Sequence, residues 1–274
     1  MTREPKMETV IPDRACRTGG RAIAPGGPAP TGGLASGAAL SLALFLVTAA
    51  SFGAEPFDAE RAAMVRTIQG YGGEVAQAVG PKGFDPRVIE AMGTVPRHQF
   101  VPERLKARAY ENRPLPIGLG QTISQPLIVA LMTHLLAPRS DHVVLEVGTG
   151  SGYQAAVLAH LVRRVHTIEI LPALAEEAAV RLGRLGYDNV VVRAGDGYHG
   201  WEEVAPFDGI IVTATTDHVP PRLVRQLKPG GRMVIPLGDP AEVQHLTVVE
   251  VDDAGTVRTR RVLPVRFVPL TGRH

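Results

Sequence analysis

The spacing of hydrophobic positions changes along the chain, and each change predicts a different kind of element. Between residues 56 and 109, apolar residues recur every three to four positions, which is the spacing of amphipathic helices. Pro114 and Pro116 interrupt this spacing, so we expect a loop up to residue 126 and another helix over 127–136. The first part of the body is therefore predicted to be helical.

Beyond residue 140, short apolar runs alternate with helical patterns. The predicted strands are 142–147, 165–170, 189–195, 207–215, 232–238, 244–251 and 258–267, and the predicted helices are 154–162, 172–185 and 221–226. Such alternation is typical of a parallel sheet that helices cover on both faces. Only turn residues separate the last two strands, which should therefore be antiparallel. We predict an α/β fold: a Rossmann-like, doubly wound, mostly parallel sheet with antiparallel C-terminal strands and an N-terminal helical cap.

Residues 1–54 differ from the rest of the chain in composition. Residues 18–33 contain six glycines and three prolines, which is typical of flexible linkers. The apolar run 39–50 follows a basic start and ends in small residues, as in a secretory signal, while the uncharged stretch 34–54 is just long enough to span a membrane. We therefore predict a basic, Gly/Pro-rich extension over 1–54 and a folded domain over 55–274.

Three interpretations of this extension stay open. Cleavage near Ala54 would release an exported body, whereas an uncleaved segment would tether the body to a membrane through residues 34–54 alone. The third interpretation is a misplaced start of translation, which would leave the body in the cytoplasm. The signal-like pattern favours export to the periplasm.

Charge and cysteine content narrow the classes of partner. The chain has 29 Lys and Arg against 27 Asp and Glu, and the first 54 residues hold five basic and three acidic ones, which leaves 24 of each in the body. A neutral body lacks the basic surface that binds a phosphate backbone, so we expect no nucleic-acid partner. The single cysteine, Cys16, lies in the extension, and the nine histidines show no ligand-like spacing, so no metal site is expected.

The sequence EVGTGSG (146–152) lies between a predicted strand and a predicted helix. Its glycines let the backbone approach a ligand closely and turn into the helix N-terminus. The third glycine comes one residue earlier than in the dinucleotide fingerprint G-x-G-x-x-G, and Glu146 precedes the first glycine by two residues. This arrangement suits a nucleoside that carries an amino-acid tail, whose ammonium group the carboxylate can meet.

Two further acidic residues strengthen this hypothesis. Glu169 ends the second predicted strand, where it can accept both ribose hydroxyls, and Asp196 follows the third, where it can accept from an adenine amino group. Each alone is more simply a solvated loop residue or a helix cap. Together with Glu146, they place three acidic residues at the binding edge of a parallel sheet. This pattern resembles the class I S-adenosylmethionine-dependent methyltransferases.

The acceptor of the methyl group can be narrowed further. Residues 213–223 lack the Asn/Asp-Pro-Pro-aromatic loop that accompanies methylation of adenine, and the body has no cysteine for attack on a pyrimidine. The segment LPIGLGQTISQP (115–126) supplies two hydroxyls, Thr122 and Ser124. A carboxylate acceptor fits, because a carboxyl with a pKa of about 4 is already ionised and needs no general base. The enzyme then has only to hold the reacting atoms in line.

Six separated motifs carry a more specific resemblance. They are VPRHQFVP (95–102), IGLGQTISQP (117–126), EVGTGSGYQAAVLA (146–159), GDG (195–197) followed by Trp201, LKPGGRMVIPLG (227–238) and VRFVPL (265–270). In this order they resemble the protein-L-isoaspartate O-methyltransferases over nearly all of residues 56–270. The resemblance implies methyl transfer from S-adenosylmethionine to the α-carboxylate of L-isoaspartyl residues in damaged proteins and peptides, whose ester then collapses to a succinimide. It also implies a monomer in the cytoplasm, where the cofactor is made.

The resemblance also assigns roles to residues. Ser124 is expected to be the active-site serine that holds the substrate carboxylate, and residues 266–270 are expected to form a strand that grips the peptide. The expected cofactor-binding residues are Thr122, Ile123, Glu146, Gly148, Thr149, Gly150, Glu169, Asp196 and Gly197.

Simpler alternatives remain beside these roles. Ser124 could cap the helix that begins near Pro126. His98 is expected to brace the N-terminal helices, and Trp201 to be a packing anchor. The same fold could also serve a methyltransferase with another carboxylate or small-molecule acceptor, or an exported protein that binds damaged peptides without turnover.

Overall fold

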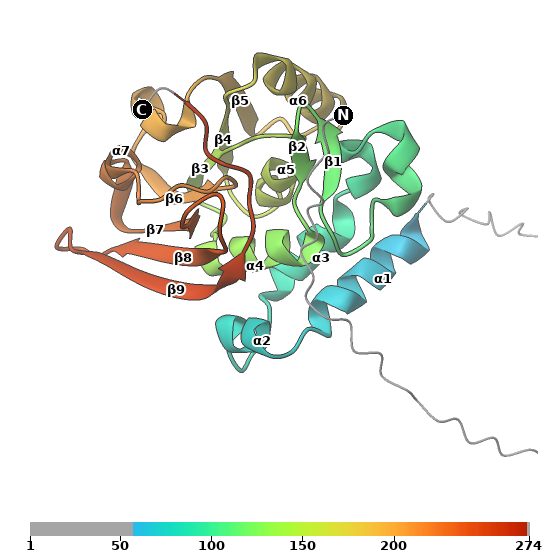
Figure 1. Ribbon diagram of the computed structural model, residues 1–274, viewed down its shortest axis with the longest axis horizontal. Helices are drawn as coiled ribbons and strands as arrows, with labels where there is room; N and C mark the ends of the chain where they lie inside the picture. Colours follow the sequence, from blue (N-terminus) through green and yellow to red (C-terminus); the bar gives the residue numbers. More distant parts are fainter. Residues whose placement is uncertain (1–56, 273–274) are drawn as a thin grey trace, which may run out of the picture. The chain divides into compact units, whose positions relative to one another are not determined.

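A seven-stranded sheet in the order β5-β4-β3-β6-β7-β8-β9 forms the centre of the molecule (Figure 1). The computed structural model describes residues 57–272, so the predicted linker and signal-like segments within 1–54 lie outside the described residues. The strands are β3 (Val143–Val147), β4 (Arg164–Glu169), β5 (Val190–Ala194), β6 (Phe207–Val212), β7 (Leu227–Leu237), β8 (Gln244–Val251) and β9 (Val257–Val265). β3 to β7 pair in parallel, whereas β8 pairs antiparallel with both β7 and β9. The predicted fold class is confirmed.

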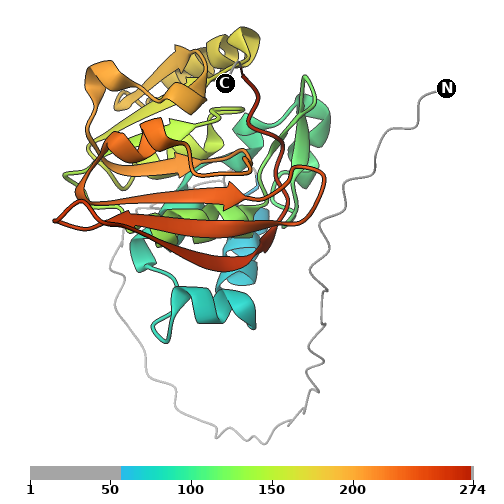
Figure 2. The ribbon, with the colours of Figure 1, turned by 60° about the vertical axis from the view of Figure 1, so that its left-hand side comes forward.

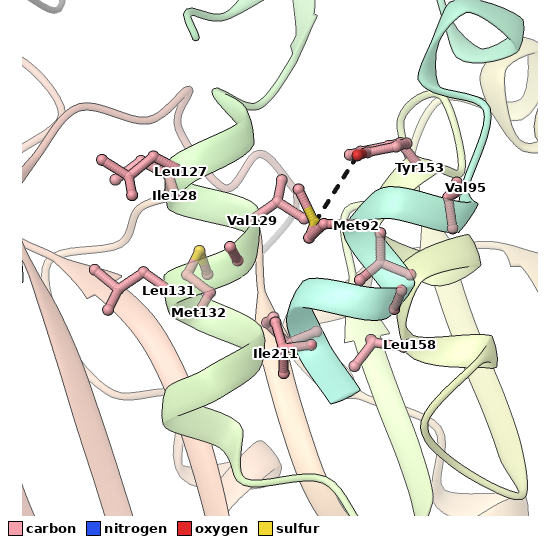
Figure 3. Close-up of a cluster of buried hydrophobic side chains, with 14 of the residues drawn as sticks. Met92, Val95, Leu127, Ile128, Val129, Leu131, Met132, Tyr153, Leu158 and Ile211 are labelled. Carbon is pink, nitrogen blue, oxygen red and sulfur yellow. Dashed lines mark hydrogen bonds between the residues drawn. The ribbon is translucent and has the colours of Figure 1, made fainter. Parts of the chain in front are cut away.

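Hydrophobic side chains on the two faces of the sheet belong to two separate clusters. Successive residues of a strand point to opposite faces, and accordingly Val144 packs in one cluster and Leu145 in the other. The first cluster includes buried residues of α4 (Pro126–Leu136) and α5 (Tyr153–Ala159), as Figure 3 shows around Met92 and Leu131. The second includes α7 (Pro221–Arg225), with Trp201 packed against it as predicted. α6 (Pro172–Arg184) contacts β4 and β5.

The predicted N-terminal helical cap consists of three helices and two 3-10 turns. They are α1 (Asp58–Gln69), α2 (Glu74–Val79), α3 (Pro86–Thr94), η1 (Arg97–Phe100) and η2 (Glu103–Arg108). His98 braces this region as expected, because its Nδ1 lies 2.9 Å from the Tyr110 hydroxyl and its ring stacks on Phe57. Among residues 57–272, no helix is both long and apolar enough to cross a membrane.

Three boundaries differ from the sequence-based expectation. The predicted loop before residue 126 contains an antiparallel hairpin of β1 (Leu115–Gly118) and β2 (Gln121–Ile123), whose strands are too short to show an alternating pattern. β7 begins at Leu227 rather than at residue 232, because the Pro-Gly-Gly sequence is accommodated by a register irregularity opposite β6. The expected strand at 266–270 is wrong: β9 ends at Val265, and beyond it only Pro269 forms an isolated bridge, with Thr215.

Candidate active site

A cleft opens at the carboxyl ends of the parallel strands. This is the edge at which open α/β sheets bind their ligands. The β1–β2 hairpin and the C-terminal coil after β9 lie beside each other above this edge (Figures 1 and 2). The cleft is lined by Gln121, Thr122, Ile123, Ser124, Val129, Glu146, Val147, Gly148, Thr149, Gly150, Ser151, Tyr153, Gln154, Ile168, Glu169, Ile170, Gly197, Thr213, Ala214, Val268, Pro269, Leu270 and Thr271. All of the predicted site residues except Asp196 are among them.

Two glycines in the wall of the cleft are packed so tightly that a side chain there would collide with its neighbours. Gly148 has φ 98°, and a Cβ built on it would lie 2.4 Å from Thr213 Oγ1. The amide of Gly148 donates to the Ile168 carbonyl at 2.8 Å, which ties the turn to β4. A Cβ on Gly197 would lie 2.4 Å from Val147 Cγ1, although this glycine comes from the segment after β5. Because glycine has no side chain, the main chain itself forms the floor of the cleft at these two positions.

Glu146 is a fully buried carboxyl in the wall of the cleft. Thr167 Oγ1 donates to its Oε2 at 2.5 Å, and Thr149 Oγ1 lies 2.6 Å from the same Thr167 hydroxyl. The other oxygen, Oε1, is buried and has no hydrogen-bond partner. Burial raises the pKa of Glu146 to about 8, and the neighbouring charge of Glu169 acts in the same direction. The arrangement therefore leaves a place for a cationic group, which would stabilise the ionised form.

Glu169, at the end of β4, is fixed by two backbone amides. Gly150 N donates to its Oε2 at 2.8 Å, and Leu171 N donates to its Oε1 at 3.0 Å. A carboxylate has about four acceptor positions, so these bonds orient the group without exhausting it. Glu169 is thus preorganised to accept further hydroxyl donors in the cleft.

Asp196 caps a short turn, as the simpler alternative proposed. Its Oδ1 accepts from Tyr198 N at 3.0 Å, at the start of η3 (Gly197–His199). Asp196 itself does not line the cleft, whereas the adjacent Gly197 does. A Cβ on Gly272 would lie 2.3 Å from Asp196 Oδ2, so the end of the described chain packs directly on this carboxyl.

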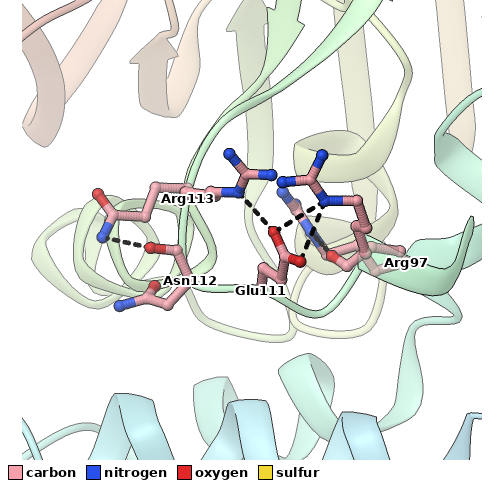
Figure 4. A network of polar contacts seen from close by, with 7 residues as sticks. Arg97, Glu111, Asn112 and Arg113 are labelled. Atoms are coloured by element: carbon pink, nitrogen blue, oxygen red, sulfur yellow. Dashed lines mark hydrogen bonds and ion pairs between the residues drawn. The ribbon is translucent and has the colours of Figure 1, made fainter. Parts of the chain in front are cut away.

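Ser124 lies between β2 and α4 and faces the cleft. The cap of α4 is Gln125, so the alternative role of Ser124 as a helix cap is wrong. Asn112 satisfies this helix end instead, because its Oδ1 accepts from Leu127 N at 3.1 Å. Its carbonyl accepts from Gln125 Nε2 at 3.0 Å (Figure 4). Within residues 57–272 the Ser124 hydroxyl has no hydrogen-bond partner, which leaves it available to a ligand.

The structure adds residues that the sequence did not single out. Tyr153, Gln154 and Thr213 line the cleft, and the position of Thr213 directly after β6 was the available signal. The C-terminal coil is held in the wall by main-chain bonds: Thr215 N donates to Val268 O at 2.8 Å, and Leu270 N donates to Thr215 O at 2.7 Å. No pattern within 268–271 predicts this long-range contact.

Known proteins resemble this chain in sequence and in structure. The family model described as protein-L-isoaspartate(D-aspartate) O-methyltransferase matches residues 77–274. Protein-L-isoaspartate O-methyltransferase 2 of Syntrophobacter fumaroxidans is 60% identical over 238 residues, which cover 85% of this chain and 96% of that protein. Protein-L-isoaspartate O-methyltransferase 1 of Cupriavidus necator is 57% identical over 238 residues, covering 86% and 91%.

Two solved structures share the fold. A protein-L-isoaspartate O-methyltransferase superposes with a TM-score of 0.67 at 28% identity, covering 77% of this chain and 66% of the other. A putative member of the same group from Plasmodium falciparum, solved in complex with S-adenosyl-L-homocysteine, superposes with a TM-score of 0.64 at 23% identity, covering 76% and 97%.

Proposed function

Because this chain belongs to the protein-L-isoaspartate(D-aspartate) O-methyltransferase family, we propose that Ser124 holds the α-carboxylate of an L-isoaspartyl residue while it is methylated. The activity is methyl transfer from S-adenosylmethionine to isoaspartyl residues, which starts the repair of damaged proteins. One observation carries the residue assignment: Ser124 and the glycine-rich turn line the same cleft.

The cleft fits the expected cofactor. When bound, S-adenosylmethionine supplies an activated methyl group on a sulfonium. We assign its ammonium group to Glu146, whose Oε1 is buried without a partner, and its ribose hydroxyls to Glu169, which is already oriented by two amides. The adenine belongs on the side of Asp196 and Gly197, where a side chain at Gly197 would collide with Val147. Thr122, Ile123, Thr149 and Gly150 complete the lining.

The residues of the cleft position groups rather than transfer protons. An isoaspartyl carboxylate is ionised at neutral pH, so its oxygen is nucleophilic without a base. The Ser124 hydroxyl can donate to one carboxylate oxygen, which orients the other for attack. The coil 268–271, held by Thr215, forms the opposite wall, where it can meet the peptide backbone.

A direct assay tests this proposal. The purified full chain is incubated with methyl-labelled S-adenosylmethionine and with two peptides that differ only in an aspartyl or an isoaspartyl bond. We expect a base-labile methyl group on the isoaspartyl peptide alone. Transfer to both peptides, or to neither while the cofactor still binds, would favour another acceptor or the binding protein without turnover.

The location of the protein is a separate proposal. The signal-like run within residues 34–54 favours export to the periplasm, whereas the supply of the cofactor favours the cytoplasm. Mass spectrometry of the native N-terminus tests export: a chain that starts near residues 52–55 supports it, and a soluble chain that starts at Met1 refutes it.

A further inference from the structure

Arg97 is a charged side chain with no exposed surface, and it contacts two residues that line the cleft, Ser124 and Tyr153. It lies in the VPRHQFVP motif, at the start of η1. Its Nε donates to the Ala109 carbonyl at 2.7 Å, and its Nη2 donates to the Ser124 carbonyl at 2.7 Å. Its third nitrogen, Nη1, is buried and has no hydrogen-bond partner in the part of the chain that the structure describes.

No carboxylate among residues 57–272 compensates this buried charge. None of the ion pairs among residues 57–272 includes Arg97. Its Cζ lies 4.6 Å from the centroid of the Tyr153 ring, a cation–π contact that offsets only part of the cost of burial. Burial lowers the pKa of Arg97 to about 10, so the guanidinium is still charged at neutral pH. The folded protein therefore keeps an uncompensated cation at this place.

Two residues that Arg97 contacts, Ser124 and Tyr153, form part of the cleft wall. Ser124 ends the β1–β2 hairpin, and Tyr153 begins α5 directly after the glycine-rich turn. A fixed positive charge behind these residues favours an anion in the cleft and disfavours a cation. The anion that the reaction brings there is the carboxylate of the acceptor, whereas the sulfonium of the cofactor is a cation.

We propose that Arg97 is a positioning residue for the acceptor: it fixes the main chain of Ser124, and its charge selects a carboxylate over a neutral group at that position. This inference rests on the proposed role of Ser124. It also explains why the unpaired guanidinium is kept in the interior, because its counter-charge arrives with the substrate.

The preference for a carboxylate is the measurement that tests this role. Two peptides are compared, one with the free isoaspartyl α-carboxylate and one with that group converted to a carboxamide, and their dissociation constants are measured with the full chain saturated with S-adenosylhomocysteine. We expect the normal chain to prefer the carboxylate at least about tenfold. Arg97→Met should lose most of this preference and Arg97→Lys should keep much of it, while the affinity for S-adenosylhomocysteine stays within about threefold in both. An undiminished preference in a folded Arg97→Met chain would overturn the inference.

Two further variants separate charge from general damage. Arg181→Met is a matched control, because Arg181 also donates to a main-chain carbonyl of the cleft wall, Ser151 O at 2.9 Å, but on the cofactor side. It should weaken cofactor binding and leave the carboxylate preference unchanged, and loss of the preference there would overturn the inference.

Ser124→Ala keeps the carbonyl that Arg97 binds, so it should keep most of the preference even though turnover falls. If the Arg97 variants fail to fold, Ser124→Ala decides. Loss of the carboxylate preference in that variant would refute the inference, because the Ser124 hydroxyl would then be the source of the preference. Failure of the normal chain to methylate the isoaspartyl peptide would instead refute the proposed function.

Discussion

Ser124 is assigned to the acceptor and Asp196 to the cofactor, so their replacement should have different kinetic effects. Ser124 faces the acceptor side, so Ser124→Ala should lower kcat by roughly 100-fold and leave the affinity for S-adenosylhomocysteine unchanged. Asp196→Ala should weaken cofactor affinity, because Asp196 holds the turn that contains Gly197. Steady-state kinetics together with calorimetric titration separate the two effects. An equal loss of cofactor binding in both variants would contradict these roles.

Glu146 links cofactor binding to pH. Its pKa is raised from 4.5 to about 8 in the folded chain, mainly by burial. A cation that pairs with Glu146 favours the ionised form, so binding below pH 8 should release a proton, and affinity should rise as pH rises toward 8. Calorimetry with S-adenosylhomocysteine in buffers of different ionisation enthalpy measures that proton. Binding without proton release at pH 7 would argue against contact between the ammonium group and Glu146.

The same raised pKa makes the stability of the ligand-free protein fall as pH rises, whereas the affinity for the cofactor rises. Between pH 4.5 and about 8 the folded state keeps a proton on Glu146 that the unfolded state has lost, so the free energy of unfolding falls as pH rises through this window. Glu146→Gln removes this dependence and should raise the melting temperature at pH 8 by a few degrees. It should also weaken cofactor binding about tenfold at that pH. A variant that loses both stability and affinity would show that the carboxylate is needed for folding.

At the scale of elements, hydrophobic patterning predicted the sheet better than it predicted the cleft wall. Strands such as β3 and β8 are buried apolar runs, and their order brings Glu146, Glu169 and Gly197 to one edge, so the cofactor side follows from topology. The β1–β2 hairpin was missed because each strand has only three or four residues and one contains Pro116. The wall around Ser124 was harder to predict, because the residues that hold it in place are distant in sequence. Asn112, for example, accepts a hydrogen bond from Leu127 at the start of α4.

The C-terminal coil is an element whose contribution can be measured by truncation. Two main-chain bonds to Thr215 hold residues 268–271 in the cleft wall, and Pro269 is exposed. Removal of residues 268–274 should therefore lower kcat/KM for an isoaspartyl peptide by roughly 100-fold and change the melting temperature by only a few degrees.

Leu270→Pro is the milder test of the same coil, since it keeps the chain length but removes the amide that donates to Thr215, together with the leucine side chain that packs on the second cluster. Its loss of activity should lie between those of the intact and truncated chains. A truncated chain with normal kcat/KM would show that the peptide binds without the coil.

At the scale of the whole molecule, the described body supplies all the residues that line the cleft. Every residue that lines the cleft lies between Gln121 and Thr271, and residues of one chain supply both walls. The expectation of a monomer stays a prediction, which light scattering at working concentrations would test. Activity per chain should then be independent of protein concentration.

A site within the body also implies that the extension is not needed for catalysis. The two hydrophobic clusters cover both faces of the sheet with residues from 57 onward, so residues 55–274 should fold alone. We expect this fragment to match the full chain in kcat/KM within about twofold, and S-adenosylhomocysteine at 100 times its Kd to stabilise both by about 2.7 kcal/mol. Thermal melts with and without ligand make the comparison. A fragment that melts normally but binds no ligand would place part of the cofactor site in residues 1–54, whereas equal behaviour would leave the extension a role in location alone.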